Sequence, residues 1–273
     1  CFFVIHRYRQ SVLKPAPGAE GLVIDHCSRK ALDCFLENMA QPLVDRIGKG
    51  LIYSFFCDSI ECDGQNWSGE LLEEFKRRRG YDLRKYIYAL WGDMGDITPH
   101  VRYDYFLTMS ELTIENFFEP LTRWCHENGS ISRIQAHGTW GDILRAYAAA
   151  DQPEGETFGD HRTLECNSIH RRMAASAGHL YGKNIISNET FTWLGNPRFT
   201  ETLEDMKASV DGVFLDGINQ IVNHGYSLTH KDLDNPGWCF YASSHISHTN
   251  TWWPYYKHLA GYIHKVSAFL QLG

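Results

Sequence analysis

Long apolar segments are missing from this sequence of 273 residues. No run reaches the roughly 18 apolar residues that a membrane-spanning helix needs. The chain also does not open with the charged and apolar regions of a secretory signal. Its first residue is Cys1 rather than Met, so we expect the natural amino terminus to be missing. The sequence therefore predicts no membrane span and leaves the compartment unknown.

An excess of positive charge is missing as well. The formal net charge is -7 and the pI is about 6.0, whereas proteins that bind nucleic acid usually carry a basic face. The dense basic run Lys76-Arg77-Arg78-Arg79 ends a predicted helix and is expected to form a solvated face. We therefore predict no nucleic acid partner.

The usual zinc-binding spacings are absent too. The 8 cysteines are scattered without Cys-x-x-Cys pairs, so most are predicted to be buried free thiols. The 14 histidines include no His-Glu-x-x-His and no His-x-His, and His245-x-x-His248 is the nearest approach to a metal motif. A metal-dependent hydrolase stays open as an alternative function.

What is present is an alternation of apolar, strand-like runs with segments of helical period, which is typical of parallel β/α units. With 43% hydrophobic residues, the chain has enough material for one large core. The predicted strands are 1–9, 51–57, 131–136, 184–188 and 218–223, with a possible short strand near Asp151. The predicted helices are 28–48, 70–79, 83–91, 100–128, a short one ending at 150, 166–181, 199–211 and 252–272.

This order predicts an α/β fold, specifically a (β/α)8 TIM-type barrel. A closed barrel needs eight strands, so we expect it to be incomplete or truncated before its last strands. We expect residues 1–273 to form one catalytic barrel domain, a fragment of a larger multidomain protein.

Two glutamates follow predicted strands. Glu61 comes after the strand 51–57 and Glu189 directly after 184–188. Barrel enzymes keep catalytic groups at the carboxyl ends of their strands, and a pair of carboxylates can serve as general acid and general base in sugar hydrolysis. The alternative for Glu61 is a carboxylate on a surface loop.

Several motifs occur in an order that resembles glycoside hydrolase family 106. They lie at 55–61, 64–67, 74–83, 133–138 and 174–183, and include Asp151-Gln152-Pro153-Glu154-Gly155-Glu156, Asn223-His224-Gly225-Tyr226 and Pro236-Gly237-Trp238. The resemblance runs from about Asp25 to Gly273. It implies an α-L-rhamnosidase that inverts configuration, with an incomplete or modified barrel, a Ca²⁺ ion near the sugar and flanking β-rich domains outside this chain. By motif, Glu61 matches the general acid and Glu189 the general base.

The second acidic cluster comprises Asp151, Glu154 and Glu156, in a segment that reads as a polar loop. Carboxylate oxygens at close spacing suit Ca²⁺, so these three are the candidate ligands, and solvated loop carboxylates are the alternative. Asp58 is a further candidate, as a metal ligand, a substrate contact or a partner that sets the protonation of Glu61.

Polar and aromatic residues near the predicted strand ends are candidates for binding the substrate. Arg133, Gln135 and His137 alternate along a strand and share a face, either toward the sugar or in a buried polar network. The other candidates are His224, Tyr226, Trp67, Trp193 and Trp238, whereas core packing is expected for Trp252 and Trp253.

Taken together, the residues and the resemblance predict a glycosidase that cleaves terminal α-L-rhamnosides, with a carbohydrate as its partner. A non-catalytic carbohydrate-binding barrel is the alternative from outside the enzymes. A glycan substrate favours an extracellular or periplasmic location.

Overall fold

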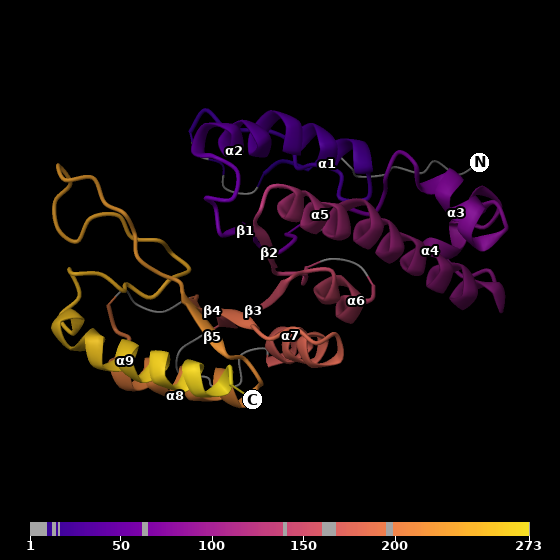
Figure 1. Cartoon of the computed structure of the whole chain (residues 1–273). Helices are drawn as coiled ribbons and strands as arrows, with labels where there is room; N and C mark the ends of the chain where they lie inside the picture. The colour runs from indigo at the N-terminus through magenta and orange to yellow at the C-terminus, as the bar shows by residue number, and fades with distance from the viewer. Residues whose placement is uncertain are drawn as a thin grey trace. The chain divides into compact units, whose positions relative to one another are not determined.

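The computed structural model of the chain describes residues 10–12, 15, 17–61, 65–138, 141–159, 168–194 and 199–272. The chain divides into two compact units, Cys1–Asp151 and Gln152–Gly273, which are described in turn (Figure 1). The strand predicted at 1–9 lies outside the described residues.

Unit 1 holds a pair of parallel strands, β1 and β2, among helices. Its helices are α1 (Arg29–Phe35), α2 (Gln41–Ile47), α3 (Leu71–Arg79), α4 (Ile97–Thr113), α5 (Glu119–Glu127) and α6 (Ile143–Ala148). The strands β1 (Ser54–Cys57) and β2 (Ile131–Ile134) pair from Ser54 with Ile131 to Cys57 with Ile134. Both strands are shorter than predicted.

The two long helices predicted in this unit are confirmed, with a wider turn inside each. A π-helical turn, η1 (Leu36–Ala40), connects α1 to α2, and another, η4 (Ile114–Phe118), connects α4 to α5. The first helix ends at Gly48 with φ 114° and the second is followed by Gly129 with φ 71°. Glycine adopts such positive φ angles without steric cost. The predicted helix 83–91 is instead two short 3₁₀ turns, η2 (Leu83–Lys85) and η3 (Ile87–Leu90).

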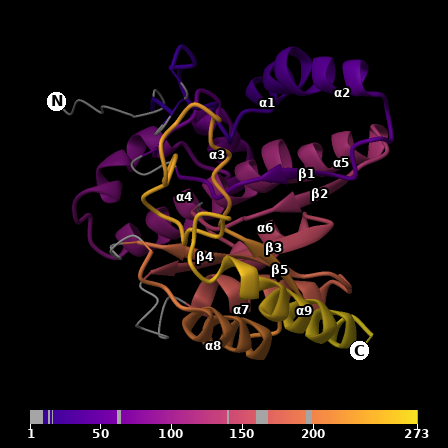
Figure 2. The same cartoon turned by 90° about the vertical axis from the view of Figure 1, so that its left-hand side faces the viewer.

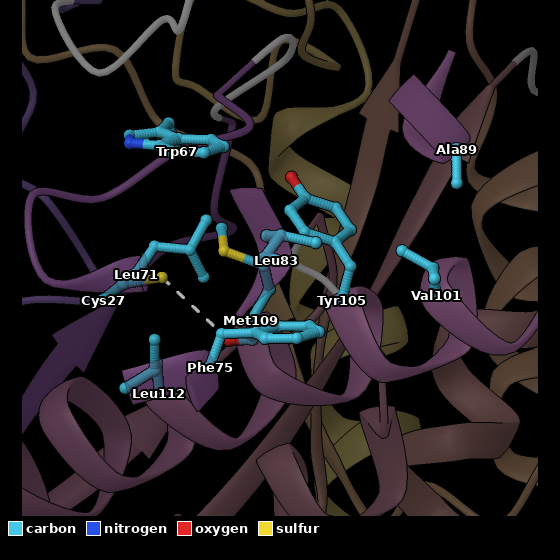
Figure 3. Packing of buried hydrophobic residues seen from close by; sticks show 10 residues of the cluster. All are labelled: Cys27, Trp67, Leu71, Phe75, Leu83, Ala89, Val101, Tyr105, Met109 and Leu112. Carbon is cyan, nitrogen blue, oxygen red and sulfur yellow. Dashed lines mark hydrogen bonds between the residues drawn. The ribbon is translucent and has the colours of Figure 1, made fainter. Parts of the chain in front are cut away.

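The core of unit 1 is apolar and packs α3 against α4 (Figure 3). Phe75 and Met109 are fully buried there. Trp67 joins the same cluster and is 8% exposed. Burial of side chains of this size supplies about 1.5–3 kcal/mol each, so this cluster is the main apolar support of the unit.

The basic run at the end of α3 is exposed at Lys76 and Arg77, as predicted, whereas Arg78 and Arg79 are partly buried and do not belong to a solvated face. Arg78 contacts Glu74 at 3.0 Å, Glu111 at 3.2 Å and Glu115 at 2.6 Å, and its side chain is only 11% exposed. Arg79 also pairs with Glu111. The guanidinium groups therefore join α3 to α4 and η4 through a network of carboxylates, which hold the pKa of Arg78 above its usual range.

Unit 2 contains three strands that pair in parallel, alternating with helices. The elements are β3 (Gln152–Gly159), α7 (Ser168–Leu180), β4 (Ser187–Trp193), α8 (Leu203–Leu215), β5 (Gln220–Asn223) and α9 (Trp253–Leu270). β4 pairs with β3 on one side and β5 on the other. Figures 1 and 2 show α8 and α9 side by side, with a long loop between β5 and α9.

The acidic segment after Asp151 is a buried strand, which confirms the possible strand predicted near Asp151 and shows that the polar loop predicted there is wrong. Residues 152–157 are all buried, and Glu154 is 0% exposed. The sequence misleads because Pro153, Gly155 and charged residues are typical of turns. Gly155 is needed here because a Cβ atom would lie 2.8 Å from the Cα atom of Arg171 on α7.

β4 starts three residues later than predicted and continues further. Side-chain hydrogen bonds replace strand pairing before it, because Asn219 accepts from Ile186 N at 2.8 Å and donates to Asn184 O at 2.8 Å. As a consequence Glu189 lies inside the strand rather than after it, and every residue of β4 is buried.

The core of unit 2 lies where α8 and α9 contact β4. Phe191, Trp193, Met206 and Val210 are buried in it, and Trp252 and Trp253 pack against it, which confirms their predicted role. The helix predicted at 199–211 starts later, because Thr202 and Asp205 form a reciprocal capping box.

An α/β fold is thus confirmed, with five described strands that pair in parallel within each unit. Eight strands of a closed barrel are not shown by the described residues. The five described cysteines, Cys27, Cys34, Cys57, Cys125 and Cys239, are free. Burial raises the pKa of the Cys57 and Cys125 thiols to about 12.

Candidate active site

Three glutamates share one face of the paired strands β3 and β4. Glu154 is in register with Ser187, and Glu156 is in register with Glu189. Residues two apart on a strand point to the same side, as do residues in register on parallel strands. The side chains of Glu154, Glu156 and Glu189 therefore leave the same face, and they are 0%, 8% and 9% exposed.

Neighbouring hydroxyl groups hold these carboxylates. Ser187 Oγ donates to Glu154 Oε2 at 2.5 Å, and Thr192 Oγ1 donates to Glu189 Oε1 at 2.8 Å. His224 Nδ1 lies 3.9 Å from Glu189 Oε1. Buried carboxylates need such donors because their desolvation is costly, so Glu189 is held in a fixed position in the strand.

The opposite face of the same strands is polar and hydrogen-bonded. The Asn188 side-chain amide donates to Thr157 Oγ1 at 2.8 Å and to Thr190 Oγ1 at 2.8 Å. The bond to Thr157 joins β3 and β4 just beside Glu189, and the bond to Thr190 lies within β4.

In unit 1, Glu61 follows the end of β1 and is exposed. Asp58 is exposed too, and its Oδ1 accepts from the backbone N of Ser59 at 2.7 Å. Ile60 N donates to His137 O at 3.1 Å, which fastens the segment after β1 to the segment after β2. Glu61 is thereby placed beyond the carboxyl end of β1, as predicted.

The polar residues of β2 and its extension are largely engaged within unit 1. The Arg133 guanidinium lies over the Phe56 ring, 4.3 Å from its centroid. Gln135 is 0% exposed, and His137 Nδ1 lies 2.8 Å from Tyr147 Oη. For His137 these contacts favour the buried polar network over direct substrate contact.

The aromatic candidates separate into buried and exposed residues. Trp67 and Trp193 pack in the cores of their own units, so packing is the role that the structure describes for them. Trp238 is 61% exposed and Tyr226 is 54% exposed. Of these four described candidates, only Tyr226 and Trp238 have a large exposed aromatic surface that a ligand could contact.

Asp151 is occupied by protein contacts. Its Oδ2 lies 2.8 Å from His126 Nε2 and accepts from Ser132 N at 2.9 Å. Asp151 N in turn donates to Ser132 Oγ at 3.0 Å. This carboxylate joins α5 to β2. The oxygens of Glu154 and Glu156 are of the hard type that Ca²⁺ prefers. No group of three or more His, Cys, Asp or Glu among the described residues is arranged to hold a metal.

A model of the alpha-L-rhamnosidase family, glycoside hydrolase family 106, matches residues 12–273. The chain belongs to this family. It is 29% identical over 271 residues to a protein of Formosa agariphila named "Putative beta-glucuronidase", a match that covers 95% of this chain and 22% of that protein. The solved structure of a rhamnosidase from Novosphingobium sp. PP1Y matches with a TM-score of 0.82 and 25% identity, over 97% of this chain and 26% of that one.

Membership of this rhamnosidase family fits a site built from glutamates on parallel strands, and it agrees with the resemblance seen in the sequence. The chain spans about a quarter of the length of both similar proteins. No described helix of this family member is long and apolar enough to cross a membrane.

No pattern in the sequence of this family member points to Glu201, which is buried beside His245. Glu201 Oε1 accepts from His245 N at 2.8 Å and lies 3.7 Å from His245 Nδ1. Burial acts to raise the pKa of Glu201, but the hydrogen bond from the backbone N of His245 and the neighbouring imidazole outweigh it and lower that pKa overall. The sequence singled out His245 only in a metal motif with His248, whereas the structure pairs His248 Nδ1 with Tyr226 Oη at 3.1 Å. No sequence spacing links residues 201 and 245.

Proposed function

We propose that the protein containing this chain hydrolyses terminal α-L-rhamnosides with inversion, with Glu61 as general acid and Glu189 as general base. The observation that carries the proposal is the position of Glu189 within a buried strand of a member of the rhamnosidase family. Thr192 fixes one carboxylate oxygen at 2.8 Å, and a protonated His224 would stabilise the ionised form from 3.9 Å.

Inversion requires two carboxyl groups with different tasks. One donates a proton to the leaving oxygen, and the other takes a proton from the water that attacks the opposite face of the sugar. Exposure of Glu61 after β1 allows it to exchange protons with solvent between turnovers. Glu189, which accepts hydrogen bonds within its strand, is suited to the ionised role.

We also propose that the described strands belong to an incomplete (β/α)8-type barrel, and that β-rich domains flank it in the longer protein. Arg133, Gln135, Asp58, His224, Tyr226 and Trp238 are the proposed substrate contacts. Sugar substrates of this kind favour an extracellular or periplasmic enzyme.

Calcium is a further proposal. Glu154 and Glu156, which share a face of β3, would hold the ion, and Asp151 would not because its oxygens bind His126 and Ser132. A bound Ca²⁺ supplies positive charge toward sugar hydroxyls. Addition of Ca²⁺ to chelator-treated protein should raise the melting temperature, and Glu156→Gln should reduce that increase. An unchanged melting temperature in the parent would refute calcium binding.

The test of the activity is release of sugar by the full-length protein. We expect hydrolysis of p-nitrophenyl α-L-rhamnopyranoside, with the product formed first in the inverted anomeric configuration by proton NMR. Glu61→Gln and Glu189→Gln should each lower kcat by at least about a hundredfold, as expected for lost general acid or base catalysis. Glu204→Gln, an exposed glutamate on α8, is the matched control.

A second candidate is hydrolysis of a β-glucuronide, favoured by the name of the Formosa agariphila relative. p-Nitrophenyl β-D-glucuronide should therefore be tested in parallel. Turnover of the glucuronide alone would replace the proposed substrate, and turnover of neither with intact folding would favour a barrel that only binds carbohydrate.

A further inference from the structure

A cavity of about 350 Å³ lies in unit 2, in the loop region between β5 and α9. Its lining includes Gly225, Thr229, Trp238, His245 and His248, together with Phe199. The volume is within the range of small-ligand sites. None of the proposed catalytic carboxylates lines this cavity, so it needs an explanation of its own.

One wall of the cavity is a buried imidazole. His245 is 8% exposed, and its two ring nitrogens have no hydrogen-bond partner within the described part of the chain. The ring is nevertheless held in place, because Phe199 packs on it with centroids 4.3 Å apart and Asn250 Nδ2 donates to His245 O at 3.1 Å. A buried polar group without a partner is costly, and a ligand hydroxyl could supply that partner.

The position of Glu201 indicates which ring nitrogen of His245 can accept a hydrogen bond. Nδ1 faces the Glu201 carboxylate at 3.7 Å, so the proton of a neutral imidazole is favoured on Nδ1. Nε2 then carries the lone pair and can accept a hydrogen bond from a hydroxyl group in the cavity.

An exposed indole forms another part of the lining. Trp238 N donates to Thr229 Oγ1 at 3.1 Å. The preceding Gly237 has φ 81°, and a Cβ atom there would lie 2.4 Å from Thr229 Cγ2. The turn is therefore built closely around Thr229, and it holds a large aromatic surface beside the cavity. Aromatic rings pack well against the C–H faces of sugars.

The cavity is connected to the proposed catalytic base. Gly225, in its lining, directly follows His224, whose Nδ1 lies 3.9 Å from Glu189 Oε1. Ser244 N donates to Phe191 O at 3.2 Å, so the wall that carries His245 is fastened to the same strand as Glu189.

We infer that this cavity binds a second sugar unit of the substrate, which packs on Trp238 and donates a hydroxyl hydrogen bond to His245. The inference rests on the proposed glycosidase function. It extends that function by giving the enzyme a preference for rhamnosyl glycans over simple aryl rhamnosides.

The experiment compares substrates with and without a second sugar, using the full-length protein. The probes are four α-L-rhamnosyl disaccharides, whose second sugar is glucose, galactose, rhamnose or glucuronic acid, and p-nitrophenyl α-L-rhamnopyranoside. For at least one disaccharide, the kcat/KM ratio relative to the aryl rhamnoside should fall about tenfold or more in Trp238→Ala and His245→Asn. Trp238→Phe, which keeps an aromatic ring, should stay within about threefold of the parent.

The matched controls are Trp91→Ala and His258→Asn, which change exposed residues outside this cavity. A ratio within twofold of the parent for all four disaccharides in Trp238→Ala would overturn the inference. That residue is exposed, so its variant should fold even where His245→Asn does not.

Calorimetric binding of the same disaccharides separates this inference from the proposed activity. Binding by the parent that Trp238→Ala weakens about tenfold, with no rhamnoside hydrolysed, would support the cavity and reject the hydrolase function. Hydrolysis with disaccharide binding unaffected by Trp238→Ala would reject the cavity and leave the hydrolase function standing.

Discussion

The two units use their buried volume differently. Unit 1 packs α3 on α4 through Phe75 and Met109, and its β1 strand has no fully buried residue. Unit 2 buries all seven residues of β4, including Asn188 and Glu189. Burying polar groups in a strand brings less stability than burying apolar ones. The burial of Asn188 and Glu189 in β4 is therefore not explained by stability alone.

Carboxylates on the strand face of unit 2 also differ from those that pair with arginine, which occur in both units and include Asp216 of unit 2, 2.6 Å from Arg171. In unit 1, carboxylates are paired with Arg78 and Arg79 between helices. On the shared face of β3 and β4 the described partners of Glu154 and Glu189 are hydroxyl groups and a histidine. A hydroxyl group that donates to a carboxylate fixes its orientation, which suits the role of base proposed for Glu189.

The largest expected effect on stability is in the apolar core of unit 1. Phe75→Ala should lower the free energy of unfolding by about 3–5 kcal/mol, because it leaves a cavity at a fully buried position. Urea denaturation measures this, with Tyr103→Ala on the exposed side of α4 as the control. A loss below about 1 kcal/mol would mean that this cluster is not the support of unit 1.

The next effect is a pH dependence that arises in unit 1. Burial lowers the pKa of His26 from 6.5 to about 4, against the opposing effects of Asp25 and Gln65. The unfolded chain then binds a proton near pH 6.5 that the folded chain resists until about pH 4, so stability falls as the pH drops through this window. His26→Gln should remove up to about 3 kcal/mol of that fall, as measured by urea denaturation between pH 7 and pH 4. An equal fall of the free energy of unfolding with pH in the parent and the variant would contradict the prediction. The control is His100→Gln, which changes an exposed histidine.

A smaller effect is expected on the polar face of unit 2. Ser187→Ala removes the hydroxyl that donates to Glu154 at 2.5 Å, and should cost about 1–2 kcal/mol because a buried carboxylate loses a donor. Thermal unfolding of this variant is compared with Ser209→Ala on α8. A variant that unfolds at a higher temperature than the parent would contradict the view that this hydroxyl stabilises the buried carboxylate of Glu154.

The smallest expected effect concerns the start of α8. Thr202→Ala breaks the capping box with Asp205 and should cost about 1 kcal/mol. Hydrogen exchange of the first turn of α8 should accelerate, whereas Thr251→Ala should leave it unchanged. Unaltered exchange in Thr202→Ala would show that tertiary contacts alone fix this helix start.

Long helices were the most predictable part of the fold. The helix ending at Gly48 and the one before Gly129 follow from apolar periodicity and a terminal glycine, both of which are local signals. The strand β3 was predicted only as a possible short strand near Asp151, and its segment mainly as a polar loop, because its Pro153 and Gly155 have turn-like chemistry. Its burial depends on Arg171 and Ser187, which no local pattern reveals.

For the candidate site, the sequence indicated candidate residues but not the contacts that they make. Glu189 and Glu61 were singled out because they follow apolar runs and match family motifs, and the structure places Glu189 within its strand rather than after it. The buried role of His137 and the pairing of Glu201 with His245 depend on contacts between distant segments. Trp67, Trp193 and Trp238 were all predicted to bind substrate because they are aromatic residues near predicted strand ends. Trp67 and Trp193 nevertheless lie in the cores.

The placement of Glu189 has a consequence for how members of such a family could diverge. A residue locked in a fully buried strand tolerates little change around it, whereas loops accept insertions and substitutions readily. The cavity of unit 2 is built almost wholly from the loop that joins β5 to α9. New glycan preferences could therefore arise by remodelling that loop, while the strand that carries the proposed base is inherited unchanged.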